Sequence, residues 1–458
     1  MKNILIIAYY YPPKGGSGVQ RISKFAKYLS RFGYNVNVLT VKEENTGLVD
    51  KSLKEDIASE IKVYRTDIKE GQILQKLLTK FNRKNKQEHN IELFDSTKVE
   101  KSSFYNRIIT SFKGLVRKIG KKVFFYFYYL FNIPDDKKGW LKYAVIEGEK
   151  IIREKNIDTI ISTSAPYTCH FIANELSKKY SVKWVADFRD PWVSNAFVKH
   201  GFVLKKIYTY LEKKIISNAD KVISVSTPII DDFIARYPEI SSDKFKVITN
   251  GYDEDDFNGI DTSQIIENDK FTILYNGTLY GIESPESMLY ALEDLIECGK
   301  VDKDKIVFKF VGNIGYNQKI LLDKYNNKYK GIIEYKEYLP HKESLKEFKN
   351  AHALLLILNE VKGVECVYTG KIFEYMRSGK PIIGIVPKGV ARDVILETST
   401  GYVADPSRKE ECGEIIYKLY KDFQEKKVEI HPRWERVKSY SRENLTKELI
   451  NILKALEH

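Results

Sequence analysis

The sequence predicts an α/β protein of two Rossmann-like, doubly wound domains that face each other across a cleft. Three observations in the 458-residue chain predict this fold class. Short apolar runs of strand length alternate with helical patterns over the first half. The same alternation starts again at residue 271, and the polar stretch 259–269 separates the two halves. A chain of this length is also too long for one ordinary hydrophobic core.

The first half opens with a strand, a glycine loop, a helix and a second strand. Residues 4–8 are an apolar run, residues 15–18 form the loop, and residues 36–40 form the second strand. Between the loop and that strand, apolar residues recur at helical spacing: Ile22, Phe25, Ala26 and Leu29. Further apolar runs predict strands at residues 159–163, 184–187 and 222–225.

The second half repeats this alternation. Its apolar runs predict strands at residues 271–275, 306–311, 332–335, 354–358 and 381–386. Such alternation implies parallel sheets that are covered on both faces and bind ligands at the carboxyl ends of their strands. We therefore expect an N-terminal domain at residues 1–258 with an insertion at about 80–140, a C-terminal domain at 265–430, and a helix in 431–458 that packs back on the N-terminal domain.

The charge balance indicates an anionic partner. A formal net charge of +13 and a pI near 9.1 are compatible with nucleic acid, a phosphorylated substrate or an acidic membrane surface, and composition alone does not choose among them. The four cysteines are scattered, which disfavours a zinc site or a disulfide framework and fits a reducing cytoplasm. The N-terminal apolar run is too short for a signal peptide, so we expect a cytoplasmic protein.

The alternation lapses in a basic, aromatic segment. Residues 101–134 contain seven basic residues, no acidic residue and the aromatic run 124–129. The apolar stretch within it is too short to cross a bilayer, which needs about 20 residues in a helix, but such a segment can lie in an anionic membrane interface. The alternative is an inserted helical hairpin whose aromatic residues pack on their own domain. Nucleic-acid binding is disfavoured because no recognition motif accompanies the charge.

The glycine loop at residues 11–18 is a candidate anion site. It follows a strand and precedes a helix, where free backbone N–H groups and the helix dipole favour an anion near Gly15 and Gly16. The loop is not the dinucleotide fingerprint, because the third glycine would fall on Arg21 and Thr40 stands where an acidic residue would close the second strand. A nicotinamide or flavin cofactor is therefore disfavoured. The alternative is a tight turn that needs glycine.

A second candidate site lies at residues 368–383. Thr369 and Gly370 lead into a helix, whose free N–H groups could bind phosphate oxygens while Lys371 adds a charge. Glu374 follows one helical turn after Gly370, close enough to accept hydrogen bonds from the hydroxyls of a ribose. The alternative is that Glu374 only complements the helix dipole.

Taken with several other stretches, these two motifs resemble a known family. The chain is similar to the retaining glycosyltransferases of family 4, which have the two-domain GT-B architecture, and most of all to bacterial members that build surface polysaccharides. The resemblance spans nearly the whole chain in the family's order. It is carried by residues 11–18, 133–135 with 139–140, 186–192, 249–253, 275–279, 369–383 and 440–445.

The resemblance implies a nucleotide diphospho-sugar held mainly by the C-terminal domain, with Glu374 as the ribose-binding glutamate. The family's second, sugar-facing glutamate is replaced by Cys366, which leaves the neighbouring Glu365 as a weaker candidate. Thr278 stands where many members carry a phosphate-binding arginine, and no lysine follows before residue 300. The expected donor-binding residues are Gly15, Gly16, Asn250, Gly277, Thr278, Gly370, Lys371 and Glu374.

Asp187 and Arg189 are the candidate catalytic residues, because they end a predicted strand at the expected cleft. Asp187 could accept a proton from the acceptor hydroxyl or orient it, and Arg189 could hold an anionic acceptor such as a lipid-linked diphosphate. The alternative is an internal Arg–Asp pair that braces the turn before Pro191. His170 follows another strand end and is as well explained by packing as by function.

The predicted activity is transfer of a hexose or N-acetylhexosamine, with retention, to a glycan or lipid-linked acceptor in lipopolysaccharide or capsule synthesis. The resemblance implies no metal and no cofactor, and Asp253 with Asp255, like Asp302 with Asp304, is interpreted as a loop-solvating pair. The basic segment would hold the enzyme at the inner face of the cytoplasmic membrane. The alternatives are a nucleotide-sugar 2-epimerase of the same fold and a non-catalytic nucleotide-sugar-binding protein.

Overall fold

The computed structural model describes residues 2–42, 50, 53, 57–69, 128–195, 198, 201–262, 269–281 and 283–457. Most of the basic aromatic segment at 101–134 therefore lies outside the described residues. Its described end includes helical residues at 128–131, where Phe131 is 64% exposed.

The N-terminal domain is built on a parallel sheet with the strand order β3-β2-β1-β4-β5-β6-β7. Its strands are β1 Asn3–Ile7, β2 Asn35–Val41, β3 Lys62–Thr66, β4 Thr159–Ser164, β5 Lys183–Phe188, β6 Lys221–Ser224 and β7 Phe245–Val247. Its helices are α1 Ser17–Arg31, α4 Leu141–Lys155, α5 Thr168–Tyr180, α6 Phe202–Asn218 and α7 Thr227–Arg236. Both faces are covered, because Leu5 and Ile7 of β1 join one apolar cluster while Ile4 and Ile6 join another.

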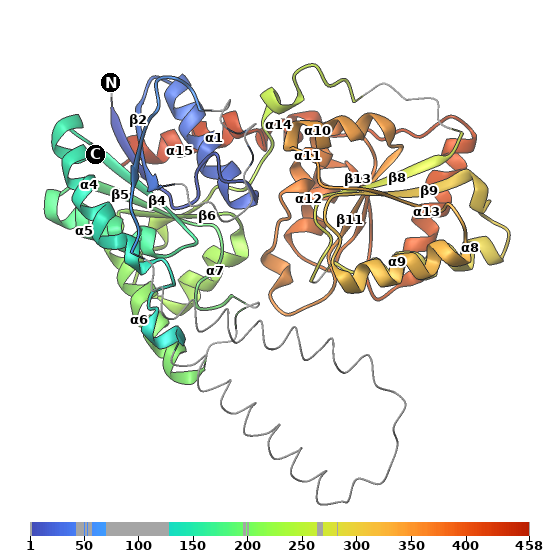
Figure 1. Cartoon of the computed structure of the whole chain (residues 1–458), viewed down its shortest axis with the longest axis horizontal. Coiled ribbons are helices and arrows are strands. Elements are labelled where there is room, and N and C mark those ends of the chain that lie inside the picture. Colours follow the sequence, from blue (N-terminus) through green and yellow to red (C-terminus); the bar gives the residue numbers. More distant parts are fainter. Residues whose placement is uncertain are drawn as a thin grey trace, which may run out of the picture.

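The C-terminal domain repeats this plan with the strand order β10-β9-β8-β11-β12-β13, again parallel. Its strands are β8 Phe271–Asn276, β9 Ile306–Val311, β10 Ile333–Lys336, β11 Ala353–Ile357, β12 Ile382–Ile385 and β13 Gly401–Ala404. Its helices are α8 Glu286–Glu297, α9 Tyr316–Lys328, α10 His341–Lys346, α11 Lys371–Ser378, α12 Val390–Thr398 and α13 Lys409–Gln424. The predicted fold class, two Rossmann-like domains with parallel sheets, is confirmed (Figure 1).

The chain crosses between the domains twice, and the two crossings lie side by side. The first is residues 248–262, which contain the 3₁₀ turn η4 Glu254–Phe257. The second leads from α14 Trp434–Ser439 into α15 Arg442–Lys454, which lies against α1 in Figure 1 and shares an apolar cluster with it. At the crossing, the Tyr252 N–H donates to the Tyr440 carbonyl at 3.2 Å. Gly251 allows this approach, because a Cβ there would lie 2.1 Å from the same carbonyl oxygen.

The sequence analysis did not predict three of the observed strands: β3, β7 and β13. β3 carries an alternation of Lys, Val, Tyr, Arg and Thr with only Thr66 buried, β7 has three residues, and β13 begins with glycine. Among the described strands, all three lie at an edge of their sheet, where one side has no paired strand and less apolar surface is required. Short 3₁₀ turns complete the described structure at Lys138–Trp140, Ser242–Lys244, Lys303–Lys305, Glu347–Asn350 and Val364–Cys366. Within the described ranges, no helix is both long and apolar enough to span a membrane.

Candidate functional site

Lys371 lies at the start of α11, at the carboxyl edge of the C-terminal sheet. Its ammonium donates to the hydroxyl of Tyr275 and, at 3.0 Å, to Oε1 of Glu283. The Tyr275 hydroxyl in turn donates to Oε2 of Glu283 at 2.8 Å. Burial lowers the pKa of Lys371 below that of an ordinary lysine, although the charge of Glu283 opposes the shift. The sequence predicted Lys371 as a phosphate ligand. It did not indicate that Tyr275 and Glu283 are the partners of this lysine.

Gly277 and Thr278 follow β8 directly beside this lysine. Gly277 has φ of +129°, and a Cβ there would lie 3.4 Å from Cε of Lys371. Thr278 is exposed. The end of β8 is tied to α11, because the Asn276 N–H donates to the Tyr375 hydroxyl at 2.9 Å. The tertiary structure therefore brings Gly277, Thr278, Gly370 and Lys371 to one place, although about 90 residues separate the two pairs in the sequence.

Glu374, one turn into α11, is held by His341. The Nε2 atom of His341 and Oε1 of Glu374 are 2.7 Å apart, and Nδ1 of His341 lies 3.9 Å from Oδ2 of Asp256. Burial alone lowers the pKa of His341, but the charges of Glu374 and Asp256 outweigh it and raise the pKa to about 9. Sequence reasoning missed His341. Its signal was a titratable residue just after a predicted strand, at the carboxyl edge where ligands bind.

Asp187 does not face a cleft, which corrects the sequence prediction. Its side chain has 0% exposure, and both carboxylate oxygens accept hydrogen bonds from the guanidinium of Arg21 at 2.9–3.2 Å. Thr163 donates a further bond at 2.8 Å. Arg21 also donates to the Thr249 carbonyl at 2.7 Å, beside the half-buried Asn250. Asp187 therefore holds α1 and the first crossing in place, because Arg21 reaches it from a helix that also buries Ile22 and Phe25.

Arg189 is likewise committed to the backbone rather than directed at an acceptor. Its guanidinium donates to the carbonyls of Ser164, Ala165 and Gly18, each at 2.6 Å. The predicted acceptor-binding role is thus replaced by a brace between β4, β5 and the glycine loop. The alternative interpretation was an internal Arg–Asp pair. Such a pair exists, but its arginine is Arg21, which bonds to Asp187, and not Arg189.

The glycine loop precedes α1 as predicted from the sequence. Gly16 is exposed, has φ of +104° and occupies the N-cap position of α1. A positive φ of this size disfavours side chains, so glycine is required by the backbone whether or not an anion binds. Gly15 is half-buried beside it.

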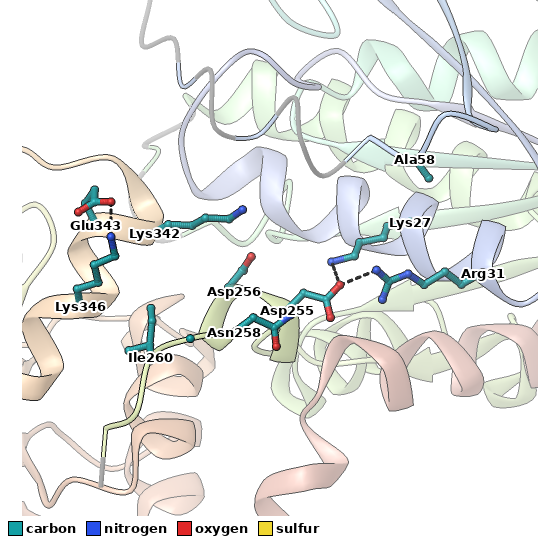
Figure 2. Close-up of a pocket in the computed structure, with 11 residues that line it drawn as sticks. Lys27, Arg31, Ala58, Asp255, Asp256, Asn258, Ile260, Lys342, Glu343 and Lys346 are labelled. Carbon is teal, nitrogen blue, oxygen red and sulfur yellow. Dashed lines mark hydrogen bonds and ion pairs between the residues drawn. The ribbon is translucent and has the colours of Figure 1, made fainter. Parts of the chain in front are cut away.

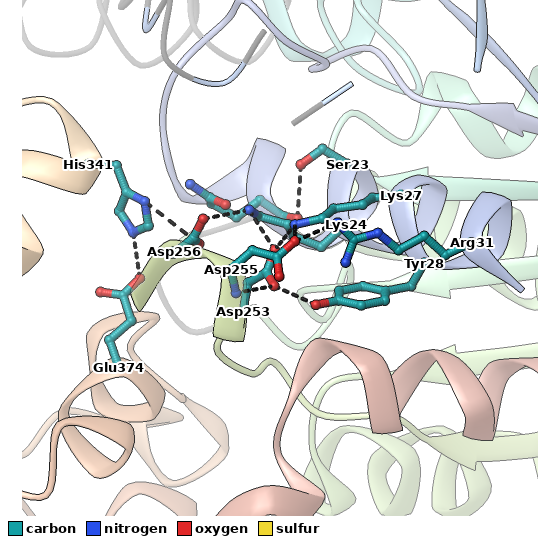
Figure 3. Close-up of polar contacts among 11 residues, drawn as sticks. Ser23, Lys24, Lys27, Tyr28, Arg31, Asp253, Asp255, Asp256, His341 and Glu374 are labelled. Atoms are coloured by element: carbon teal, nitrogen blue, oxygen red, sulfur yellow. Dashed lines mark hydrogen bonds and ion pairs between the residues drawn. The ribbon is translucent and has the colours of Figure 1, made fainter. Parts of the chain in front are cut away.

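The basic face of α1 meets the acidic turn η4 of the first crossing. Asp253 accepts hydrogen bonds from Lys27 and from the Tyr28 hydroxyl, both at 2.6 Å, and forms an ion pair with Lys24 at 2.8 Å (Figure 3). Asp253 is only 3% exposed. The interpretation of Asp253 as a loop-solvating residue is therefore wrong, because α1 brings cations to it from more than 220 residues away.

A pocket of about 490 Å³ lies beside this contact, between α1, the first crossing and α10 (Figure 2). Its cations already have partners: Lys27 and Arg31 pair with Asp255, and Lys346 pairs with Glu343. The predicted donor-binding residues are not among its lining residues. The pocket is therefore a feature of the domain crossing rather than of the predicted donor-binding residues.

The remaining candidates lie nearby or are buried. Glu365 is exposed in the 3₁₀ turn Val364–Cys366 (η7), and the Cys366 carbonyl accepts a hydrogen bond from Ser226 of the N-terminal domain at 2.9 Å. His170 is fully buried, with Nδ1 2.8 Å from the Ser162 hydroxyl, and burial lowers its pKa to about 3. In the described part of the chain, His, Cys, Asp and Glu form no group of three or more that could hold a metal ion.

The fold matches that of known glycosyltransferases. Residues 89–256 match the family model described as Glycosyltransferase Family 4, and residues 257–433 match the model described as Glycosyl transferases group 1. A search of curated protein sequences found no match.

Solved structures similar to the whole chain include Anabaena Alr3699/HepE in complex with UDP-glucose, with a TM-score of 0.59 and 12% identity over 99% of this chain and 100% of that one. Sucrose-phosphate synthase from Thermosynechococcus elongatus has a TM-score of 0.58 and 12% identity, over 100% of this chain and 99% of that one. The lipopolysaccharide outer core galactosyltransferase WaaB in its apo form has a TM-score of 0.56 and 13% identity, over 99% of this chain and 99% of that one. Two consecutive parts of the chain therefore match glycosyltransferase family models, and its two parallel-sheet domains have the GT-B fold.

Proposed function

We propose that the protein transfers a sugar, with retention, from a nucleotide diphospho-sugar to a glycan or lipid-linked acceptor in surface polysaccharide synthesis. The observation that carries this proposal is the placement of Lys371 at the first position of α11, against Gly277 and beside Glu374. A cation at a helix N-terminus suits a diphosphate, and a carboxylate one turn later suits a ribose.

In this proposal the donor diphosphate lies at the start of α11, with the N–H groups near Gly370 and the ammonium of Lys371 as its ligands. Glu283 holds this ammonium at 3.0 Å, so an arriving diphosphate competes with Glu283 for it. Gly277 and Thr278 line the same edge. Gly15, Gly16 and Asn250 are the candidate contacts from the N-terminal domain, and Glu365 is the candidate contact to the sugar.

The chemistry would place charge on the leaving phosphate, which these fixed donors stabilise better than mobile water does. With retention, the acceptor attacks on the face from which the nucleotide diphosphate departs, and the departing phosphate takes the acceptor proton. Asp187 and Arg189 act in this scheme only by keeping α1, β4 and the first crossing in position. No metal or cofactor is required.

The proposed acceptor and location rest on the sequence and on the relatives' names. WaaB is named as a lipopolysaccharide outer core galactosyltransferase, and the basic aromatic segment 101–134 would bring the enzyme to a membrane-borne acceptor at the inner face of the cytoplasmic membrane.

The test is incubation with radiolabelled UDP-, GDP- and dTDP-sugars, with and without lipid-linked acceptors and with and without EDTA. The expected result is acceptor-dependent label transfer that EDTA leaves unchanged, with NMR showing the donor's anomeric configuration in the product. Epimerised donor without any acceptor would instead support a 2-epimerase. Nucleotide binding without turnover on any acceptor would support a non-catalytic binding protein. Binding to vesicles with and without anionic lipid tests the membrane contact separately.

A further inference from the structure

A continuous chain of charges runs from α1 of the N-terminal domain to the donor site. Lys24 on α1 lies 2.8 Å from Asp256 in η4, Asp256 lies 3.9 Å from His341, and His341 lies 2.7 Å from Glu374 (Figure 3). The first step and the last are direct contacts, and the middle one is an ion-pair distance. His341 is the member that connects the crossing to α11.

We propose that His341 is a positioning residue for nucleotide binding, whose ring holds the Glu374 carboxylate in the orientation that meets the donor ribose. The inference rests on the proposed function, because it assigns Glu374 to the ribose. His341 touches neither the ribose nor the reacting atoms in this proposal and acts through Glu374.

The two ring nitrogens of His341 both face carboxylates. A neutral imidazole has one N–H donor, whereas the imidazolium has two, so this surrounding selects the charged ring. The charged groups that face it are Glu374 from α11, Asp256 from η4 and Lys24 from α1. The two carboxylates outweigh Lys24, and the pKa of about 9 keeps the ring charged at neutral pH.

The contact leaves half of the Glu374 carboxylate available to a ligand. Oε1 is engaged by His341, whereas Oε2 accepts no hydrogen bond from any described residue. The Glu374 side chain is 23% exposed. A ribose hydroxyl can therefore donate to Oε2 while His341 prevents the carboxylate from rotating away, which lowers the ordering cost of binding.

The test measures nucleoside diphosphate affinity by calorimetry for H341Q, E374Q and the double variant, using the tightest binder among UDP, GDP and ADP and its 2′,3′-dideoxy analogue. E343Q is the matched control, because Glu343 lies two residues away on α10 in an exposed pair with Lys346. We expect H341Q to weaken binding of the ribonucleotide about tenfold and to leave the affinity for the dideoxy analogue unchanged. E343Q should bind both nucleotides as the wild type does. In the E374Q background, H341Q should have no further effect. With a sugar donor, H341Q should raise KM and leave kcat nearly unchanged.

The outcomes separate this inference from the proposed function. If H341Q binds the ribonucleotide as tightly as the wild type while E374Q binds it more weakly, His341 has no positioning role and the donor site stands. If H341Q weakens binding of the ribonucleotide and of the dideoxy analogue equally, the inference is also overturned, because a structural role would affect both affinities. If the wild type binds none of the three nucleotides, the proposed function fails with it. Should H341Q not fold, D256N tests the same ribose-dependent loss from the other side of the ring.

Discussion

Two cation–carboxylate pairs lie at the carboxyl edges of the two sheets and differ in their access to solvent. In the N-terminal domain, the side chains of Arg21 and Asp187 are 1% and 0% exposed. In the C-terminal domain, those of Lys371 and Glu283 are 14% and 11% exposed. The sequence predicted a functional role for one member of each pair, Asp187 and Lys371, and in our proposal only the second pair exchanges a partner for a ligand.

The physical reason is the cost of separating charges away from water. A sealed pair such as Arg21 with Asp187 leaves an uncompensated buried charge when it opens. Lys371 and Glu283 are partly exposed, and in the proposed donor site an incoming diphosphate would replace Glu283 as the anion beside Lys371. Charge at a strand end therefore marks a ligand site only where some of the side chain remains open.

Breaking the sealed pair should give the largest effect. Asp187→Asn keeps the shape of the side chain but leaves the buried Arg21 charge without its counter-ion. We therefore expect a loss of about 3–5 kcal/mol in the free energy of unfolding, measured by urea denaturation. Asp231→Asn, at an exposed aspartate of α7, should change it by less than about 0.5 kcal/mol. A stable Asp187→Asn protein that lacks only activity would return Asp187 to the list of catalytic candidates.

Breaking the open pair should act on activity instead. Lys371→Ala removes the charge at the start of α11, and we expect kcat/KM to fall about a hundredfold, or about 2.7 kcal/mol. The unfolding midpoint should stay within a few degrees of wild type. Lys346→Ala, at an exposed lysine of α10, is the control. Full activity in Lys371→Ala would disprove the donor-site assignment.

The pH dependence of stability should reveal the charged His341. Its pKa, about 9 in the folded protein against 6.5 for an ordinary histidine, is raised, so its stabilisation is complete below 6.5 and is lost as pH rises through 9. Relative to H341Q, the wild type should lose about 2 kcal/mol between pH 7 and pH 9. Denaturant unfolding of both proteins at the two pH values checks this, and a constant difference would mean that the ring does not carry this charge.

The contact between the sheet edges should give the smallest effect. Ser226→Ala removes the hydrogen bond from Ser226 to the Cys366 carbonyl, and we expect about 1 kcal/mol of lost stability. Ser439→Ala, which removes only a hydrogen bond to the Arg436 carbonyl one helical turn away, serves as the control. A loss above about 3 kcal/mol would show that this contact carries more of the domain interface than one hydrogen bond.

The sequence predicted the fold class and the interior strands well, because buried parallel strands are continuous apolar runs that periodicity detects. It missed the edge strands β3, β7 and β13, whose composition is set by fewer neighbours. The tight turn considered for the glycine loop was also readable, since Gly16 has a positive φ that favours glycine.

The sequence by itself determined the alternation of strands and helices, the order of motifs and the residue types at each strand end. Which charged side chains meet was decided only by the tertiary structure. Arg21 reaches Asp187 across 166 residues, Lys371 reaches Glu283 across 88, and His341 reaches Glu374 across 33. Periodicity reports the local backbone and the buried face, whereas the partner of a charge depends on how separate elements pack, and that packing converted Asp187 from a candidate base into a structural anchor.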